Sequence, residues 1–543
     1  MSETDLGIYL IIVLMAMAVS MAVIPLMMRL APVIGMIDLP DARKVHVIPV
    51  PRVGGVGIVV GALVPLFIWL PLDNLVLSFL IGSLVLLVFG AWDDAKELGH
   101  YVKFVGQFIA ATVVVYYGDL YVVHFPFMGL DLLPEWIGRP FTIIAIVGMI
   151  NAINHSDGLD GLAGGESLLS LTVIAYLSFQ YDSSLIVTIS AATIGGVFGF
   201  LRFNSHPARV FMGDGGSQFL GFSLAFLVIV LTQRANEVLS PALPLLLLGL
   251  PIADILAVFV LRARGGMNLF EATKNHIHHR LLELGFHHYE AVMIIYSIQI
   301  LFIVCAILIP YGYDLEIISI YFLVCATVFV VLTFAERRCW KVNRSYYFSE
   351  GLISRIPHRD IAVKIPNKVL EMGVSLFLIG AVLMSNTVPL DIGISSLILL
   401  VLLFLSFTAW MGGFLYRLVI FVTVGFAVYL LSTYPPEWLL LENHIIYIYF
   451  GLITVFAFFA ARLMVSEQFQ ITPLDYLVIM MALIIGFVQG SGFDSTDLVW
   501  MVIQIIILFY ASELTIQNMQ KRFNFLTGSA VVALALLALR GLV

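Results

Sequence analysis

The sequence has 543 residues with 27 basic and 35 acidic side chains, so charged residues make up 11% of the chain, against about 25% in soluble domains. Hydrophobic residues account for 61% and aromatic residues for 13%. Such a chain lacks the polar side chains to cover several soluble domains. The composition therefore excludes a soluble enzyme, a disordered protein, a nucleic-acid-binding protein and a secreted disulfide-rich protein. It predicts an all-α, polytopic integral membrane protein.

Apolar stretches of about 17 to 25 residues, the length that crosses a bilayer, follow one another along the chain. The acidic start lacks the basic region of a secretory signal, so the first apolar run is expected to remain as a transmembrane helix. Eleven spans are predicted in the first part of the chain, at 7–31, 55–72, 75–92, 103–120, 141–155, 167–181, 185–201, 216–232, 241–261, 291–311 and 316–334. Seven more are predicted at 369–388, 393–411, 418–433, 443–461, 474–491, 497–516 and 525–543.

Basic residues are unevenly divided between the two sides that these spans define. With the N-terminus outside, twelve of the fourteen basic residues before residue 290 face the cytoplasm, and only Arg139 and Arg234 face outward. Cytoplasmic loops of membrane proteins carry an excess of Lys and Arg, which favours this orientation. The long basic segment 336–368 is predicted to be a cytoplasmic linker between a membrane domain at 1–335 and a C-terminal membrane region at 369–543.

Acidic, histidine and glycine residues gather in five segments on the side expected to be cytoplasmic. These segments are 38–57, 92–103, 151–166, 202–218 and 262–288. A single one could be an ordinary polar loop, but five on one face indicate a functional site. Asp93 and Asp94 are adjacent carboxylates at the end of a span, and they repel each other unless a cation lies near them. A solvated loop start is the alternative for this pair.

Two further segments place carboxylates beside glycines. Asp157 and Asp160 lie three residues apart, and each precedes a glycine. One helical turn would bring both carboxylates to the same side, and glycine lets a ligand approach the backbone. Carboxylates next to phosphate groups are typical of Mg²⁺ sites. Asp214, flanked by glycines before a span, is a third candidate, because a helix N-terminus there could bind the anion.

Histidines are concentrated in the segment that begins at Asn275. A zinc site is one interpretation, but no cysteine accompanies these residues and no glutamate completes a helical metal motif. Imidazole and guanidinium groups suit diphosphate oxygens equally well. His287 and His288 are expected to be polar loop residues. The candidates in this segment are His276, His278, His279 and Arg280.

Taken together, the five segments resemble the polyprenyl-phosphate N-acetylhexosamine-1-phosphate transferase family, of glycosyltransferase 4 type, across residues 1–335. The resemblance rests on the motifs R-K-x-H-x-x-P-x-P-R-x-G-G, D-D, N-x-x-D-G-x-D-G-L, F-M-G-D-x-G-S and H-I-H-H-R, which occur in this order. The H-I-H-H form is similar to the branch that transfers N-acetylglucosamine 1-phosphate to undecaprenyl phosphate. The muramoyl-pentapeptide branch carries a different histidine-rich loop and is the alternative.

The resemblance implies that a UDP-N-acetylhexosamine and polyprenyl phosphate give polyprenyl-diphosphate-sugar and UMP. It implies Mg²⁺ as the cofactor, with Mn²⁺ as an alternative, and a first membrane step in cell-envelope polysaccharide biosynthesis, such as that of lipopolysaccharide or O-antigen. It places the active site on the cytoplasmic face of the bacterial inner membrane and leaves a homodimer open. Direct attack of the lipid phosphate is favoured over a covalent aspartyl-phosphate intermediate.

The resemblance also implies roles for individual residues. The residues expected to be catalytic are Asp93, Asp94, Asp157, Asp160, His276, His278 and His279. Those expected to bind substrates are Arg43, Lys44, His46, Arg52, Lys103, Asn154, Asn204 and Arg280. The expected metal ligands are Asp214, Asp93 and Asp157.

Two other classes of protein remain as alternatives. A transporter would be expected to carry charged groups near the middle of the bilayer, and Asp254, close to Pro251, is the conspicuous one in the first eleven spans. A non-enzymatic scaffold would not need glycines beside each acid. The C-terminal region 369–543 shows no catalytic cluster, so its role is open.

Overall fold

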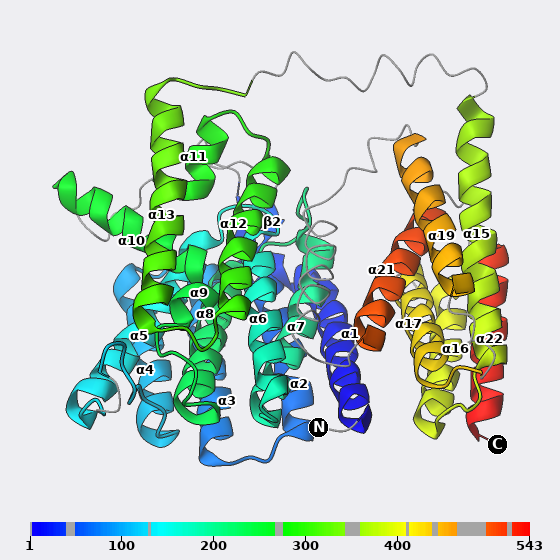
Figure 1. Ribbon diagram of the computed structural model, residues 1–543, viewed down its shortest axis with the longest axis horizontal. Coiled ribbons are helices and arrows are strands. Elements are labelled where there is room, and N and C mark those ends of the chain that lie inside the picture. The colour runs from blue at the N-terminus through cyan, green and yellow to red at the C-terminus, as the bar shows by residue number, and fades with distance from the viewer. Residues whose placement is uncertain are drawn as a thin grey trace. The chain divides into compact units, whose positions relative to one another are not determined.

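The computed structural model describes residues 3–39, 49–128, 132–266, 275–342, 359–408, 412–436, 444–463, 496–517 and 524–542. Over these residues the chain is 80% helical, and the strands β1 (Ile37–Asp38) and β2 (Val50–Pro51) form one short antiparallel pair. The described residues divide into two compact units, one within 3–342 and the other within 359–542 (Figure 1).

The first unit contains a helix in each of the eleven ranges predicted for it. Its elements are α1 (Glu3–Ile34), α2 (Gly54–Trp69), α3 (Asn74–Lys96), α4 (His100–Thr112), η1 (Val113–Tyr117), α5 (Glu135–Ser156), α6 (Leu162–Gln180), α7 (Ser184–Asn204), α8 (Gly213–Val230), η2 (Leu231–Ala235), α9 (Pro244–Leu247), α10 (Gly249–Arg264), α11 (Ile277–Glu283), α12 (His288–Leu308) and α13 (Asp314–Arg337). Helix α8 is buried from Gly215 to Val230, and α2, α3 and α5 pack against it. The start of this central helix therefore lies among the ends of its neighbours.

Helix boundaries depart from the predicted spans at two places. The span predicted at 141–155 begins earlier, at Glu135, which gives it the length of a full crossing. The span predicted at 241–261 is two helices, because the chain leaves helical geometry at Leu248, where φ is −113° and ψ is 26°. Hydropathy is insensitive to such a break, since the residues on both sides of it are apolar.

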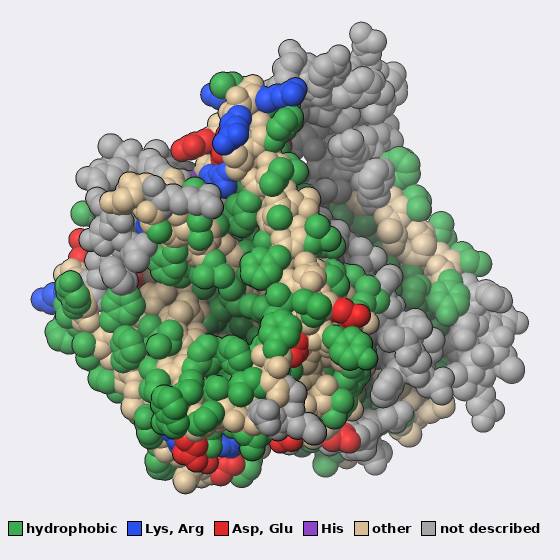
Figure 2. All heavy atoms as spheres, turned by 60° about the vertical axis from the view of Figure 1, so that its left-hand side comes forward, with side chains coloured by type: hydrophobic (Ala, Val, Ile, Leu, Met, Phe, Trp, Pro, Cys, Tyr) green, Lys and Arg blue, Asp and Glu red, His purple; other side chains and the backbone are tan. Residues whose placement is uncertain are grey.

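The first unit exposes many large hydrophobic side chains, as lipid contact requires. Figure 2 shows hydrophobic side chains across much of one face. On α13 the side chains of Phe322, Leu323 and Val330 are 62%, 67% and 65% exposed, which would be unfavourable in water over so large an area. Ten helices among the described residues are long and apolar enough to cross a membrane. The prediction of an all-α polytopic membrane protein is confirmed.

The second unit is also a helical bundle with its own buried apolar core. Its described helices are α15 (Arg359–Met384), α16 (Leu390–Thr408), α17 (Gly412–Thr433), α19 (His444–Leu463), α21 (Thr496–Gln517) and α22 (Phe525–Leu542). Helix α15 begins ten residues before the span predicted at 369–388. The span predicted at 474–491 lies outside the described residues. A salt bridge of 3.0 Å joins Arg417 Nε on α17 to Glu513 Oε2 on α21.

Candidate active site

Backbone hydrogen bonds bring two of the predicted segments together at the start of α8. The amide of Gly54 donates to the carbonyl of Phe211 over 2.9 Å, and that of Gly55 donates to Met212 over 2.7 Å. A Cβ atom added at Gly55 would lie 2.2 Å from the amide nitrogen of Gly216. The double glycine of the first motif thus allows α2 to pack directly on the backbone of α8.

Asp93 and Asp214, which are far apart in the sequence, share one lysine. Lys103 Nζ lies 2.7 Å from Asp93 Oδ2 and 2.5 Å from Asp214 Oδ2. The other oxygen of Asp93, Oδ1, is buried without a hydrogen-bond partner. Asp93 lies in the last turn of α3, Lys103 in the first turn of α4 and Asp214 in the first turn of α8, so three helix ends meet around a single ammonium group.

Asp94, next to Asp93, faces the backbone of α8. Its Oδ1 accepts a hydrogen bond from the amide of Asp214 over 3.0 Å, and its Oδ2 accepts one from Gly215 over 3.4 Å. Gly213 has a φ of +71°, and a Cβ there would lie 2.5 Å from Asp94 Oδ2. Carboxylates stabilise helix N-termini by accepting such bonds. The two adjacent acids therefore do different things, and Asp94 holds Asp214 in place.

Asn154 orients the second oxygen of Asp214. Its Nδ2 donates to Asp214 Oδ1 over 3.2 Å and to Ser217 Oγ over 2.8 Å. Asp157 follows at the end of α5. Burial, together with the carboxylates of Asp214 and Asp160, raises the pKa of Asp157 to about 7. The segment predicted from N-x-x-D-G therefore does lie beside the acid of F-M-G-D.

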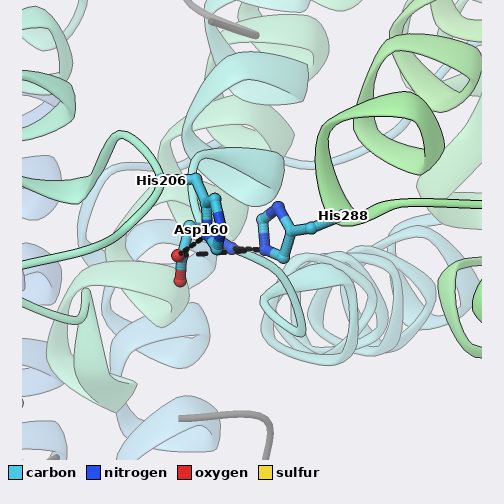
Figure 3. Close-up of side chains that lie close together, drawn as sticks. All are labelled: Asp160, His206 and His288. Carbon is cyan, nitrogen blue, oxygen red and sulfur yellow. Dashed lines mark hydrogen bonds and ion pairs between the residues drawn. The ribbon is translucent and has the colours of Figure 1, made fainter. Parts of the chain in front are cut away.

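Asp160 contacts two histidines that come from other segments (Figure 3). His206 Nδ1 is 2.6 Å from Asp160 Oδ2, and the backbone amide of Asp160 donates to His288 Nε2 over 2.9 Å. The two rings stack with their centroids 4.2 Å apart. Their ligand atoms lie within 4.8 Å of one another, a spacing that could suit a metal. However, Asp160 Oδ2 is already bonded to His206 and to the amide of Ala208, so the cluster holds itself together by hydrogen bonds.

Asn204 and Tyr296 fix the same loop from the inside of the unit. Asn204 Oδ1 accepts a bond from the amide of Gly161 over 2.7 Å, and its Nδ2 donates to the carbonyl of Val210 over 2.9 Å. Tyr296 Oη donates to the carbonyl of Gly161 over 2.7 Å. The amide of Asn204, predicted to bind substrate, thus joins the loop before α6 to the segment before α8.

The histidine-rich segment is anchored by Asp254 on α10. Asp254 Oδ2 lies 2.7 Å from His276 Nδ1, and its Oδ1 accepts a bond from the amide of Ile277 over 2.9 Å. His276 also stacks on His155, with ring centroids 5.2 Å apart. Asp254, which the sequence singled out only for the transporter alternative, therefore positions the segment that follows α10.

His278 is buried against the glycine of the N-x-x-D-G motif. A Cβ added at Gly158 would fall 2.2 Å from His278 Nε2. Burial, with a smaller contribution from the charge of His279, lowers the pKa of His278 to about 3. Its imidazole is therefore neutral at physiological pH and could accept or donate hydrogen bonds without carrying charge.

Arginines of the predicted site are paired with acids. Arg280 contacts Glu336 on α13 through Nε at 2.6 Å and Nη2 at 2.8 Å, a bidentate arrangement. Arg52 pairs with Asp38 and lies 3.8 Å from Glu97. Arg43, Lys44 and His46 fall outside the described residues.

Sequence patterns alone did not identify every residue that shapes this site. The prediction of His288 as a polar loop residue was wrong, because His288 is the first residue of α12 and its Nε2 accepts a hydrogen bond from the amide of Asp160. His206 was not predicted, although it stands within the 202–218 segment ahead of Pro207. Asp254 and Tyr296 lie in apolar helices, where only a tertiary structure reveals their partners.

The donor set suits a hard divalent cation. Mg²⁺ prefers carboxylate oxygens, with waters or phosphates completing its shell. Asp93 and Asp214 already direct two oxygens at one positive group, and Asp93 Oδ1 is a buried acceptor without a donor. Mg²⁺ therefore fits these residues chemically.

The chain is similar to known proteins of one family. The family model "Glycosyl transferase family 4" matches residues 76–232. A Bacillus subtilis protein named a probable undecaprenyl-phosphate N-acetylglucosaminyl 1-phosphate transferase is 36% identical over 287 residues, covering 52% of this chain and 80% of the relative. The Mycobacterium leprae decaprenyl-phosphate N-acetylglucosaminephosphotransferase is 34% identical over 288 residues, covering 47% of this chain and 72% of the relative.

A more distant relative covers a larger share of both chains. The undecaprenyl-phosphate alpha-N-acetylglucosaminyl 1-phosphate transferase of Escherichia coli K12 is 27% identical over 327 residues, which is 58% of this chain and 88% of the relative. The resemblance seen in the motifs is therefore confirmed. The chain belongs to the polyprenyl-phosphate N-acetylhexosamine-1-phosphate transferase family, glycosyl transferase family 4, in the branch of its N-acetylglucosamine-1-phosphate transferase relatives.

Proposed function

We propose that the chain transfers N-acetylglucosamine 1-phosphate from UDP-N-acetylglucosamine to polyprenyl phosphate, giving polyprenyl-diphosphate-N-acetylglucosamine and UMP. The observation that carries the proposal is the meeting of Asp93, Lys103 and Asp214 at one end of three apolar helices. A lipid phosphate cannot leave the membrane surface, so its reaction with a water-soluble donor requires charged groups at such a place. The names of the relatives support the sugar and the lipid.

In the proposed reaction an oxygen of the lipid phosphate attacks the β-phosphorus of the donor. The bond between that phosphorus and the bridging oxygen breaks, and UMP leaves with the bridging oxygen. A phosphate monoester is already largely dianionic near pH 7, so no strong base is required. This accords with the position of Asp94, whose carboxylate is engaged with the backbone of α8.

The residues of the chain would bring two anions together. Asp214 and Asp93, with Asp157 as a third ligand, would hold Mg²⁺ or Mn²⁺, and a divalent cation there would offset the negative charge of the diphosphate. Asn154 fixes the orientation of Asp214. Neutral His278, with His276 and His279 beside it, would hydrogen-bond the donor. Fixed donors of this kind are most effective where water is excluded.

We further propose that the site faces the cytoplasm of a bacterium and that the N-terminus lies outside. The excess of basic residues on this side supports the orientation. Cys339, just after α13, is exposed, whereas Cys305 and Cys325 are half-buried within helices. In intact cells a membrane-impermeant maleimide should leave Cys339 unlabelled and should label it after permeabilisation. Labelling of Cys339 in intact cells would reverse the orientation.

The reaction is tested with purified full-length protein, polyprenyl phosphate and Mg²⁺. UMP should be released from UDP-N-acetylglucosamine, and Asp214→Asn should abolish release without changing the thermal unfolding midpoint. Glu97→Gln is the control, because it removes an exposed acid near the same helix ends. Absence of UMP with every UDP-N-acetylhexosamine would refute the proposal. Release from the muramoyl-pentapeptide donor alone would favour the alternative that the relatives do not support.

A further inference from the structure

The contact of Lys103 with two carboxylates has a geometric consequence for metal binding. Its Nζ atom is 2.7 Å from Asp93 Oδ2 and 2.5 Å from Asp214 Oδ2. These are short, charge-assisted hydrogen bonds, so the ammonium group lies where the two oxygens converge. A divalent cation bound to the same oxygens would lie about 2.0–2.1 Å from each. The ion and the ammonium group would therefore require the same position.

A second observation shows that the lysine alone does not satisfy this site. Oδ1 of Asp93 accepts no hydrogen bond, although Asp93 is only 6% exposed. A buried carboxylate oxygen without a partner is unfavourable. Two carboxylates thus share one ammonium group, which leaves negative charge for an ion of higher charge to balance.

We infer that the Lys103 ammonium group neutralises Asp93 and Asp214 until a divalent cation binds. The divalent cation then displaces the ammonium group from both carboxylates. The ammonium group and the divalent cation would repel each other strongly if both contacted these two oxygens. The side chain of Lys103 is 25% exposed, and its flexible four-carbon stem lets the charge move toward water. The inference takes the metal site from the proposed function but does not depend on which sugar is transferred.

Removal of the lysine charge tests the exchange directly. Lys103→Met should bind Mn²⁺ on the order of tenfold more tightly than the wild type, measured by electron paramagnetic resonance on full-length protein without substrates. Lys96→Met is the matched control, because Lys96 is exposed and lies three residues after Asp93 at the end of α3. Its Mn²⁺ affinity should change by less than about twofold. Unchanged or weaker binding by Lys103→Met would overturn the inference.

A measurement on the wild type does not depend on how the variant folds. The rate at which an amine-acylating reagent modifies Lys103 should rise when Mg²⁺ is added, because the displaced ammonium group becomes accessible. The rate for Lys96 should stay the same. Mass spectrometry of the labelled peptides gives both rates, and a Lys103 rate that is insensitive to Mg²⁺ would contradict the exchange.

The UMP assay separates this inference from the proposed function. If the wild type releases no UMP but Lys103→Met binds Mn²⁺ more tightly, the proposed function fails and the exchange stands. If the wild type releases UMP and neither Mn²⁺ affinity nor Lys103 labelling changes, the exchange fails and the function stands.

Discussion

Gly158 lies directly against the ring of His278, and a single added carbon atom at Gly158 would fall 2.2 Å from His278 Nε2. The two residues belong to segments more than a hundred positions apart, and the contact joins the N-x-x-D-G motif to the H-I-H-H motif. The close approach of the His278 ring therefore leaves no room for a larger side chain at Gly158.

Gly158→Ala should push the two segments apart. Overpacking a well-packed contact costs about 1–3 kcal/mol, so the thermal unfolding midpoint should fall and UMP release should drop by on the order of tenfold or more. Gly148→Ala on α5 is the control, because an added Cβ there meets nothing within 4 Å. Combining Gly158→Ala with His278→Ala should recover the midpoint. Wild-type activity of Gly158→Ala would show that the contact is unimportant.

His278→Gln should make the folded protein less sensitive to acid. Burial lowers the pKa of His278 to about 3, whereas an unfolded histidine has a pKa of about 6.5. Between these values the unfolded chain binds a proton that the folded chain does not, so stability is complete above pH 6.5 and falls toward pH 3. At pH 5 this loss is roughly 2 kcal/mol, and the variant should lack it.

Thermal unfolding midpoints at pH 7.5 and pH 5 measure this difference. The unfolding midpoint of the wild type should fall further from pH 7.5 to pH 5 than that of His278→Gln does. His124→Gln, which changes a histidine between η1 and α5, should behave like the wild type. Identical losses in the wild type and in His278→Gln would mean that the ring does not need to stay neutral.

Asp94→Ala should be more harmful to stability than Asp94→Asn. Alanine leaves the amides of Asp214 and Gly215 without their acceptor, at a cost of about 1–3 kcal/mol for buried donors. Asparagine keeps one acceptor oxygen, so its unfolding midpoint should lie between those of alanine and the wild type. If both variants are inactive but unfold like the wild type, Asp94 acts in the chemistry rather than in holding α8.

Arg280→Met and Glu336→Gln should have similar effects, because each breaks the same bidentate pair. The double variant should then lose little more UMP release than either single variant, as expected for residues that act together. A much larger loss for Arg280→Met than for Glu336→Gln would instead support the contact between Arg280 and the donor diphosphate that the motif predicts. Measurement of kcat and KM separately for UDP-N-acetylglucosamine would distinguish these outcomes.

The helices could be predicted from the sequence because lipid contact demands long apolar runs. Deviations arose where hydropathy carries no signal. The break at Leu248 lies between apolar residues, and the first turns of α5 contain Trp136, Arg139 and Pro140, which mask its early start. Such interfacial residues at helix ends are common in membrane proteins. A search for apolar residues stops where it meets them, so the predicted helix is too short.

Within the site, the sequence identified residue types and their motifs but not their separate tasks. Asp93 and Asp94 look alike in sequence, yet one contacts Lys103 and the other contacts the amides of α8. This difference depends on the direction of each side chain on α3. His288 and Asp254 could not be assigned because their partners, Asp160 and His276, are distant in sequence. Pairings of this kind are set by tertiary packing.

The buried amide of Asn204 has a practical consequence for altering donor preference. One side chain hydrogen-bonds to the amide of Gly161 and to the carbonyl of Val210, so it ties the loop ahead of α6 to the stretch ahead of α8. Libraries that randomise only one of these two segments would disturb the hydrogen bonds of Asn204. Directed evolution should therefore vary both together and keep Asn204 fixed.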